Sequence, residues 1–272
     1  MKTVSTLMST YAAEKDSNLA QALESVFSQT RPPEQLVLVI DGPIPPAQEF
    51  VIRRYCNDPR VMEITVLYLP DQSGLAAAMN AGLTACAGDY IMRMDSDDIC
   101  TPDRLEIQMR YALANPDVDV ISSWSEEFFV DGGSSRIKAS SVEHEHVTSA
   151  LRWRNILVHP TILAKRSALR DVGGYRSKFG QLEDYDLFVR MATEGFRFHV
   201  IPKTLVRVRS SIAQSARRGG WRYGLKEVAF RWECKKLGFL RLHQFAATTS
   251  LYLVFRLASG AVRKRLYSLV RA

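Results

Sequence analysis

The chain has 272 residues, of which 46% are hydrophobic and 24% are charged. This length and apolar content exclude a disordered protein and allow one large α/β domain or two smaller domains. The four cysteines show no CxxC spacing, which argues against a zinc site or a disulfide framework and favours a reducing, cytosolic compartment. The apolar stretch after Met1-Lys2 is too short, and too soon followed by charge, to predict a signal peptide.

Charge divides the chain into two parts. The formal net charge is +7, yet the residues from Lys203 onward carry 16 lysines and arginines against two acids, a balance of +14. The first 202 residues carry 20 bases and 27 acids, a balance of −7. The chain is therefore an acidic body with a basic tail. Such a tail attracts polyanions, and both nucleic acid and an anionic membrane face fit this description.

Strand-like and helix-like segments alternate over the first 116 residues. Short apolar runs predict strands at 4–8, 36–40, 64–69 and 90–94. Apolar residues spaced three and four apart, together with helix-start residues, predict helices at 19–27, 46–55, 75–85 and 101–115. In the last of these, Thr101 is expected as the N-cap and Pro102 in the first turn. Alternation of this kind predicts an α/β fold with a mostly parallel sheet and right-handed crossovers.

The pattern changes after Pro116. It predicts strands at 118–123 and 161–164, a helix at 143–153, a ribbon at 128–137 that turns at Asp131-Gly132-Gly133, and a glycine turn at 172–175. A further helix opens at Glu183-Asp184-Tyr185-Asp186. Asp184 shares a face with Leu187, Phe188 and Met191 and is expected at the edge of a buried stripe. Asp186 is expected to form an ordinary exposed pair with Arg190.

Three carboxylates, Asp95, Asp97 and Asp98, end the apolar strand that begins at Tyr90. In an extended backbone Asp95 and Asp97 point to the same side, so their charges repel unless a cation lies between them. This arrangement suits Mg²⁺ or Mn²⁺ carrying substrate phosphates. The alternative is a set of turn acids that cap the next helix. An EF-hand loop is excluded, because the sixth residue of a loop starting at Asp95 is Cys100 and not glycine. Asp98 is either a second metal ligand or an acid at the N-terminus of the next helix.

Several motifs occur in an order that resembles family 2 glycosyltransferases of the GT-A nucleotide-sugar-binding fold. The similarity is to bacterial enzymes that build capsular, exopolysaccharide or O-antigen repeat units. The motifs are Met8-Ser9-Thr10-Tyr11, Ser25 to Thr30, Asp41-Gly42, Gly74 to Asn80, Asp95 to Asp98, Gly173-Gly174-Tyr175-Arg176 and Glu183-Asp184. The resemblance implies a catalytic domain at 1–210, with a nucleotide-binding half at 1–116 and an acceptor-binding half at 117–210, and a basic helical tail at 211–272.

The resemblance also implies roles for individual residues. Ser9, Tyr11 and Asp41 would line the nucleotide base pocket, although Asp41 also fits a simple turn. Asp95 would reach the ribose or the metal, and Asp97 would bind a metal that offsets the charge of the departing nucleoside diphosphate.

Asp184 would be the general base of an inverting single displacement, the alternative being a helix N-terminal acid. Glu183 would be a supporting or acceptor-facing carboxylate, and His159 either lies near the cleft or is structural.

Other residues near the expected nucleotide carry two interpretations each. Gly74 and Asn80 flank a helix start that approaches the nucleotide or packs tightly. Arg217 and Arg218 lie in a stretch that folds over a pyrophosphate or faces a membrane. Two departures from the family pattern, Ile40 and Met79, lie where the base would be read, and UDP is favoured over GDP or dTDP.

The uncharged stretch at 244–255 is too short to span a membrane and fits an interfacial segment flanked by cations, with a helix packed on the body as the alternative. We therefore expect a metal-dependent enzyme at the inner face of the cytoplasmic membrane, acting on a UDP-sugar donor and a lipid-linked saccharide acceptor. The other hypotheses are a non-catalytic sugar-nucleotide binder and a nucleic-acid-binding protein. We expect no nucleic-acid partner, because no recognisable binding module is present.

Overall fold

The computed structural model describes residues 2–60, 63–130, 134–210 and 220–257. Their strands are β1 (Val4–Tyr11), β2 (Gln35–Asp41), β3 (Glu63–Leu69), β4 (Tyr90–Asp95), β5 (Ile99–Cys100), β6 (Val120–Phe129), β7 (Arg136–Lys138), β8 (Leu163–Lys165) and β9 (Phe198–Ser210). Their helices are α1 (Asp16–Phe27), α2 (Pro46–Cys56), α3 (Leu75–Ala85), α4 (Arg104–Ala114), α5 (His144–Leu151), α6 (Arg166–Asp171), α7 (Glu183–Thr193), α9 (Trp221–Lys236) and α10 (Leu242–Leu257), with short 3-10 turns η1 (His159–Thr161) and η2 (Ser177–Phe179).

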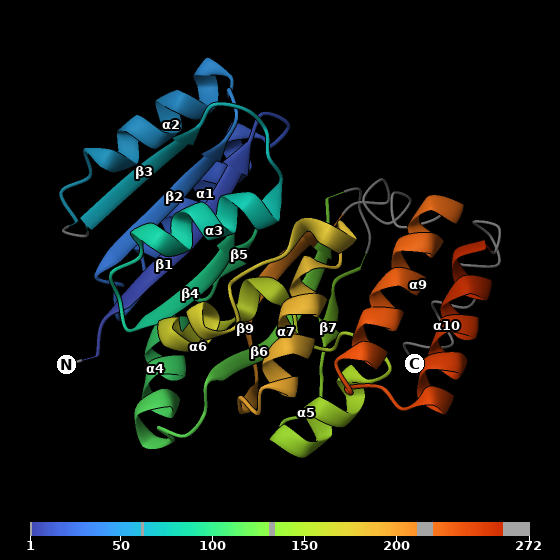
Figure 1. Cartoon of the computed structure of the whole chain (residues 1–272). Coiled ribbons are helices and arrows are strands. Elements are labelled where there is room, and N and C mark those ends of the chain that lie inside the picture. Colours follow the sequence, from blue (N-terminus) through green and yellow to red (C-terminus); the bar gives the residue numbers. More distant parts are fainter. Residues whose placement is uncertain (1, 61–62, 131–133, 211–219, 258–272) are drawn as a thin grey trace.

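The described strands form one curved sheet in the order β3-β2-β1-β4-β8-β6-β9-β5, with β7 paired to β6 (Figure 1). The first four strands in this order are parallel to one another, and β6 is parallel to β9. All seven residues of β2 are buried, as expected for a central parallel strand that is covered on both faces. The predicted α/β fold with a mostly parallel sheet is confirmed.

Helices cover both faces of the sheet and produce two hydrophobic clusters. Alternate residues of β2 enter opposite clusters, because successive side chains of a strand point to opposite faces. The cluster on one face includes Leu19 and Leu23 of α1, and the cluster on the other includes α3, α7 and α9. The apolar stripe predicted for the first helix is buried in full.

Helix α4 begins later than predicted. Thr101 was expected to cap it, but the helix starts at Arg104 and Asp103 occupies the preceding position. The reason is tertiary: the backbone N–H of Thr101 donates to the carbonyl of Leu205 in β9 at 2.9 Å, next to the β5–β9 pairing. Thr101 therefore continues a strand contact. Its hydroxyl donates to Asp103 at 2.8 Å instead of to a helix N–H group.

The pair between Asp186 and Arg190 is buried, which corrects the prediction of an exposed pair. Arg190 Nε donates to Asp186 Oδ2 at 2.9 Å, and Arg176 binds the same carboxylate through two nitrogens. Arg190 also donates to the carbonyls of Val172 and Gly174, so this ionic cluster fixes the predicted glycine turn, where Gly174 has a φ of 67°. The pair is buried because α7 is covered on several sides, which its own amphipathic pattern does not reveal.

Helix α9 packs against the rest of the fold beside α7 and η2 (Figure 1). Phe230 and Cys234 are buried in the same cluster as residues of α7, and the ring of Phe230 lies 4.7 Å from that of Tyr185. Helix α10 lies against α9. None of the described helices is long and apolar enough to cross a membrane. Arg217 and Arg218, predicted to form a pyrophosphate loop, lie outside the described residues.

Replacing Asp186 with alanine should strongly destabilise the fold. The change leaves two arginines without the carboxylate that pairs with them in a buried place, and such a loss costs about 3–5 kcal/mol. Urea unfolding of purified protein measures it. Glu49→Gln breaks an exposed i, i+4 pair with Arg53 and should change stability by less than about 0.5 kcal/mol. A similar small change for Asp186→Ala would contradict the structural role of this cluster.

Candidate active site

The carboxyl ends of β1, β2 and β4 meet at one edge of the sheet and bring together residues far apart in sequence. In the parallel register Ser9 lies beside Asp95, and Tyr11 lies beside Asp41. Since β1 has neighbours on both sides that are reached by separate crossovers, this edge is the place where open α/β sheets bind ligands. The register thus assembles four of the predicted nucleotide-site residues.

A cleft of about 330 Å³ opens at this edge. It is lined by Ser9, Thr10, Tyr11, Glu14, Asp41, Gln72, Gly74, Leu75, Asp95, Ser96 and Asp97. A Cβ atom added to Gly74 would meet no atom within 4 Å, and the φ of 88° at this residue favours glycine. The start of α3 therefore leaves open space beside the cleft. Six of the predicted site residues line the cleft together.

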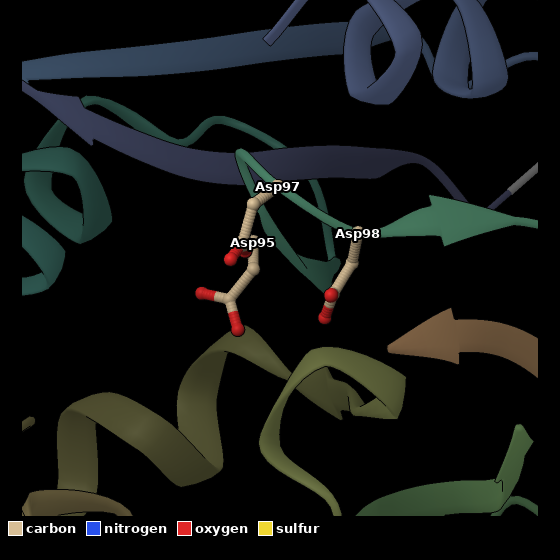
Figure 2. A group of neighbouring side chains, drawn as sticks. All are labelled: Asp95, Asp97 and Asp98. Carbon is tan, nitrogen blue, oxygen red and sulfur yellow. The ribbon is translucent and has the colours of Figure 1, made fainter. Parts of the chain in front are cut away.

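Asp95 ends β4, and Asp97 and Asp98 lie in the short loop that follows; Figure 2 shows the three side chains near one another. We call residues 95–98 the aspartate loop. Among the described residues, Asp95, Asp97 and Asp98 place carboxylate oxygens within 4.8 Å of one another. Asp98 is buried, and Asp95 and Asp97 are partly buried. Oxygen ligands at this spacing are the donor set that Mg²⁺ and Mn²⁺ prefer. Asp98 lies six residues before α4, which removes the alternative of a helix N-terminal acid.

The charges of this cluster are not balanced by protein groups alone. Burial, together with the neighbouring Asp95, raises the pKa of Asp97 to about 7. Burial, together with the charges of Asp95 and Asp97, holds the pKa of Asp98 well above its usual value. The second carboxylate oxygen of Asp98 is buried and has no hydrogen-bond partner within the described residues. A divalent cation would relieve both the repulsion and the missing bond, so these residues fit a metal site.

Two arginines from different strands contact the aspartate loop. Arg93 is buried in β4 and pairs with Asp95. From β9, the backbone N–H of Arg209 donates to Asp98 Oδ1 at 2.7 Å, and its Nε donates to the carbonyl of Asp97 at 2.8 Å. Arg209 also reaches Gln21 of α1 at 3.0 Å. The loop that presents the carboxylates is thereby tied to β9 and to α1.

Asp41 organises the neighbouring loop as well as lining the cleft. Its two oxygens accept the backbone N–H groups of Ser73 at 2.7 Å and Gly74 at 2.9 Å. Gly42, with a φ of 84°, allows this loop to approach, because a Cβ atom there would lie 2.7 Å from the backbone nitrogen of Gln72. Each carboxylate oxygen keeps a second lone pair, which leaves capacity to accept a base N–H.

Asn80 and His159 lie outside the cleft-lining set and share a partner, Tyr175. The amide of Asn80 both donates to the carbonyl and accepts from the N–H of Tyr175, each at 2.8 Å. His159 Nε2 lies 2.9 Å from the hydroxyl of Tyr175. Burial, and to a smaller degree Arg93, holds the pKa of His159 well below its usual value, so the ring is neutral. The packing interpretation of Asn80 and the structural interpretation of His159 match these contacts.

Glu183 and Asp184 lie at the start of α7, partly exposed. Asn155 donates to Asp184 Oδ2 at 2.9 Å. Both acids and Asp95 raise the pKa of the buried Tyr175 by their charge, after the larger effect of burial. Through these charge effects Tyr175 interacts with the acids at the start of α7 and with Asp95 at the end of β4.

Sequence reasoning missed three residues of this site. Arg93 carries a detectable signal, since a charged residue two positions before Asp95 in an apolar strand shares its face. Glu14 lines the cleft and contributes to the raised pKa of Asp97, yet its position just before a helix is typical of many acids. Asn155 lies in an irregular turn and gives no signal, because its partner is 29 residues away.

The comparisons with known proteins agree with this geometry. A model of the family described as Glycosyl transferase family 2 matches residues 5–173. The chain belongs to glycosyl transferase family 2. That stretch includes β1 to β8 and the three aspartates, so the predicted family is confirmed.

Two similar proteins are bacterial glycosyltransferases by name. The amylovoran biosynthesis glycosyltransferase AmsE of Erwinia amylovora is 32% identical over 240 residues, 87% of this chain and 88% of that protein. The UDP-Gal:alpha-D-GlcNAc-diphosphoundecaprenol beta-1,3-galactosyltransferase of Escherichia coli is 29% identical over 269 residues, 98% and 95% of the two chains.

Among solved structures, S. aureus TarS 1–349 in complex with UDP-GlcNAc has a TM-score of 0.70 at 16% identity, covering 94% of this chain and 73% of that chain. This likeness confirms the predicted GT-A fold.

The Asp97→Asn variant should be more stable than the native protein when no metal is added at pH 8. When the pKa of an aspartate is raised in the folded state, ionisation of that aspartate destabilises the fold. The free energy of unfolding therefore falls as the pH rises from about 4 towards 7. The difference in urea midpoint should shrink as the pH is lowered towards 4. Asp103→Asn is the control, because a hydrogen bond from Lys203 lowers the pKa of Asp103. A difference independent of pH would contradict the repulsion in the aspartate cluster.

Proposed function

We propose that this family 2 glycosyltransferase is a metal-dependent, inverting enzyme that transfers a sugar from a nucleoside diphosphate sugar to a hydroxyl group of a lipid-linked saccharide. One observation carries the proposal: a cleft of about 330 Å³ and three clustered carboxylates occur together at the carboxyl edge of β1, β2 and β4. A second pair of carboxylates, Glu183 and Asp184, begins α7, and these two acids and Asp95 all raise the pKa of Tyr175 by their charge.

The donor half of the reaction belongs to the cleft. Tyr11 offers a packing face for the base, Asp41 offers an acceptor for a base N–H, and Ser9 lies beside Asp95 on the neighbouring strand. Asp95 and Asp97, with Asp98 behind them, would hold Mg²⁺ or Mn²⁺. When bound, the cation supplies positive charge for the diphosphate that leaves with the nucleoside. Arg93 and Arg209 keep the carboxylates in place for this task.

The acceptor half centres on Asp184. Its carboxylate takes the proton from the acceptor hydroxyl while that oxygen bonds to the anomeric carbon, and the bond from this carbon to the diphosphate oxygen breaks. Attack from the face opposite the leaving group inverts the anomeric configuration, as in the inverting glycosidases. Glu183, the residue before Asp184, supports the acceptor. Residues 1–210 would then supply the groups that react with the donor and the acceptor, in two halves.

UDP is the nucleotide that the comparisons favour. The Escherichia coli relative is by its name a UDP-galactose enzyme, and the TarS structure holds UDP-GlcNAc. That relative also acts, by its name, on a sugar attached to diphosphoundecaprenol, which is the basis for a lipid-linked acceptor here. Because such an acceptor is not soluble in water, we propose that the enzyme works at a membrane surface, the inner face of the cytoplasmic membrane.

Helices α9 and α10 offer a surface suited to that location. Trp221, Leu225 and Trp232 are exposed and share one face of α9 by their spacing of four and seven. Leu242 of α10 is 68% exposed and follows Arg241. Tryptophan, leucine and cations combined in this way are typical of proteins that lie on an anionic bilayer.

Thermal unfolding with Mn²⁺ and UDP-, GDP- or dTDP-sugars tests the donor site, because a ligand that binds the native state raises the melting temperature. A shift with the UDP-sugar is expected, and it should disappear with EDTA or in Asp97→Ala. Asp184→Asn should keep the shift but lose about 10²–10⁴-fold in nucleotide release, the range for a lost general base. Asp117→Asn, at an exposed acid, is the control. No shift with any of the three nucleotides would contradict the proposal.

Binding to phospholipid vesicles tests the membrane surface. The protein should sediment with vesicles containing phosphatidylglycerol and much less with phosphatidylcholine alone. The double variant Leu225→Ser with Leu242→Ser should reduce partitioning at least about tenfold, since each buried leucine contributes roughly 1.5–3 kcal/mol. Leu113→Ser, at a leucine of α4 that is 53% exposed, should leave sedimentation unchanged. Equal loss in both would refute a specific role for α9 and α10, without affecting the reaction proposed above.

A further inference from the structure

Asn155 holds the proposed general base in a defined orientation. Its side-chain oxygen accepts the backbone N–H of Leu157 at 3.1 Å, so its NH₂ group must face the other way, where it donates to Asp184 Oδ2 at 2.9 Å. Asp184 Oδ1 accepts the backbone N–H of Tyr185 at 2.7 Å. A carboxylate that accepts a hydrogen bond at each oxygen has its plane fixed, and the ionised form is favoured.

The turn that carries Asn155 is itself held by the next residue of α7. The hydroxyl of Tyr185 donates to the carbonyl of Leu151, the last residue of α5, at 2.6 Å. Tyr185 therefore links the end of α5, from which the chain runs to Asn155, to the helix that begins at Asp184. Because Asn155 and Asp184 are 29 residues apart in the sequence, their hydrogen bond needs tertiary contacts that hold these two segments together, and the Tyr185–Leu151 hydrogen bond is one of them.

A buried arginine of α9 completes the link. Arg231 Nη1 donates to the Tyr185 hydroxyl at 3.1 Å, and its two amino groups reach the carbonyls of Arg152 at 3.5 Å and Trp153 at 3.4 Å. Glu227, one turn earlier on α9, pairs with it at 3.2 Å. Arg231 is 1% exposed. Since burying a charge is costly unless it is paired and hydrogen-bonded, the position of this arginine is strongly determined by these contacts.

We propose that Asn155, Tyr185 and Arg231 are positioning residues for Asp184, so that helix α9 is a working part of the catalytic domain and not a separable tail. The inference rests on the proposed function, because it takes Asp184 as the general base. These three residues act through Asp184 and not by contact with the acceptor. They act by keeping the carboxylate of Asp184 oriented and ionised as it takes the proton of the acceptor hydroxyl.

Other charged and titratable groups near Asp184 come from several elements. Glu183 is next to it on α7, and Asp186 on the same helix is committed to Arg176 and Arg190. The charge of Asp184 and that of Asp95 both raise the pKa of Tyr175, which lies before η2, and His159 of η1 is hydrogen-bonded to the Tyr175 hydroxyl. The variants below leave all of these side chains in place, so a change in pH dependence reports on the altered contact.

Asn155→Asp is the sharpest test, because it keeps the shape of the side chain while replacing the donor by a second carboxylate. Like charges at hydrogen-bond distance raise the pKa of an acid, so the acid limb of kcat against pH should move up by about one unit or more. We expect kcat at pH 7 to fall at least about tenfold, with the KM for the nucleotide sugar changed less than twofold. Asn115→Asp, at an asparagine that caps α4, should leave the pH profile unchanged.

Tyr185→Phe and Arg231→Lys test the link to α9. Removing only the hydroxyl of Tyr185 should lower kcat about threefold to tenfold without changing the donor KM. Tyr55→Phe is the matched control. Tyr55 is also buried, and its hydroxyl lies 3.1 Å from two acceptors, the Ala20 carbonyl and the Glu24 carboxylate, on the opposite face of the sheet. Thermal unfolding of each variant shows whether it is folded at the assay temperature. If Arg231→Lys is unfolded, Asn155→Asp and Tyr185→Phe still decide the question.

The outcomes separate this inference from the function on which it rests. If Asp184→Asn is inactive while Asn155→Asp and Tyr185→Phe keep native kcat and a native acid limb, the positioning role is refuted and the general base stands. If Asp184→Asn retains native activity, the base assignment itself fails. A donor KM that rises in step with the fall of kcat would also overturn the inference, since it would indicate a general loss of structure.

Discussion

Like charges crowded at the end of a buried strand are the constraint on which the site depends. Asp95, Asp97 and Asp98 bring oxygens within 4.8 Å of one another, and charges interact more strongly there than in water because the surroundings are less polarisable. Two arginines offset part of this repulsion: Arg93 pairs with Asp95, and Arg209 donates to the backbone carbonyl of Asp97. The pKa of Asp97 nevertheless stays raised, to about 7. The remaining repulsion favours binding of a cation together with an anionic diphosphate.

The other half of the molecule uses buried ion pairs for positioning. Asp186 pairs with Arg176 and Arg190 and fixes the glycine turn before η2. Within α9 Glu227 pairs with Arg231, which also donates to Tyr185 of α7. Such pairs contribute little net stability compared with apolar packing, but they define geometry. They also change the meaning of the basic tail. Arg209 and Arg231 count toward its +14 balance, yet both make their contacts inside the body, so the surface is less basic than the count of residues indicates.

Much of the nucleotide half could be predicted because its physics is local. Parallel strands covered on both faces are continuous apolar runs, and helices on a sheet carry stripes at three and four. Helix α3 has the predicted bounds, and β2 and β4 extend the predicted runs by one or two residues. Once the strands are parallel, their carboxyl ends share an edge, so Ser9, Tyr11 and Asp41 meet Asp95 without further information. The start of α4 was wrong because a contact with Leu205, over 100 residues away, competes with helix formation.

The amino-acid sequence by itself determined the family, the α/β order of elements and the aspartates that a metal-dependent transferase would use, because residue type and short spacing carry that information. Only the tertiary structure decided that Asn80 and His159 serve Tyr175, that the pair of Asp186 and Arg190 is buried, and that Asn155 faces Asp184. These contacts join residues that are far apart in the chain or covered by another element. Periodicity reports which face of a helix is apolar, but it does not reveal which distant side chain will cover that face.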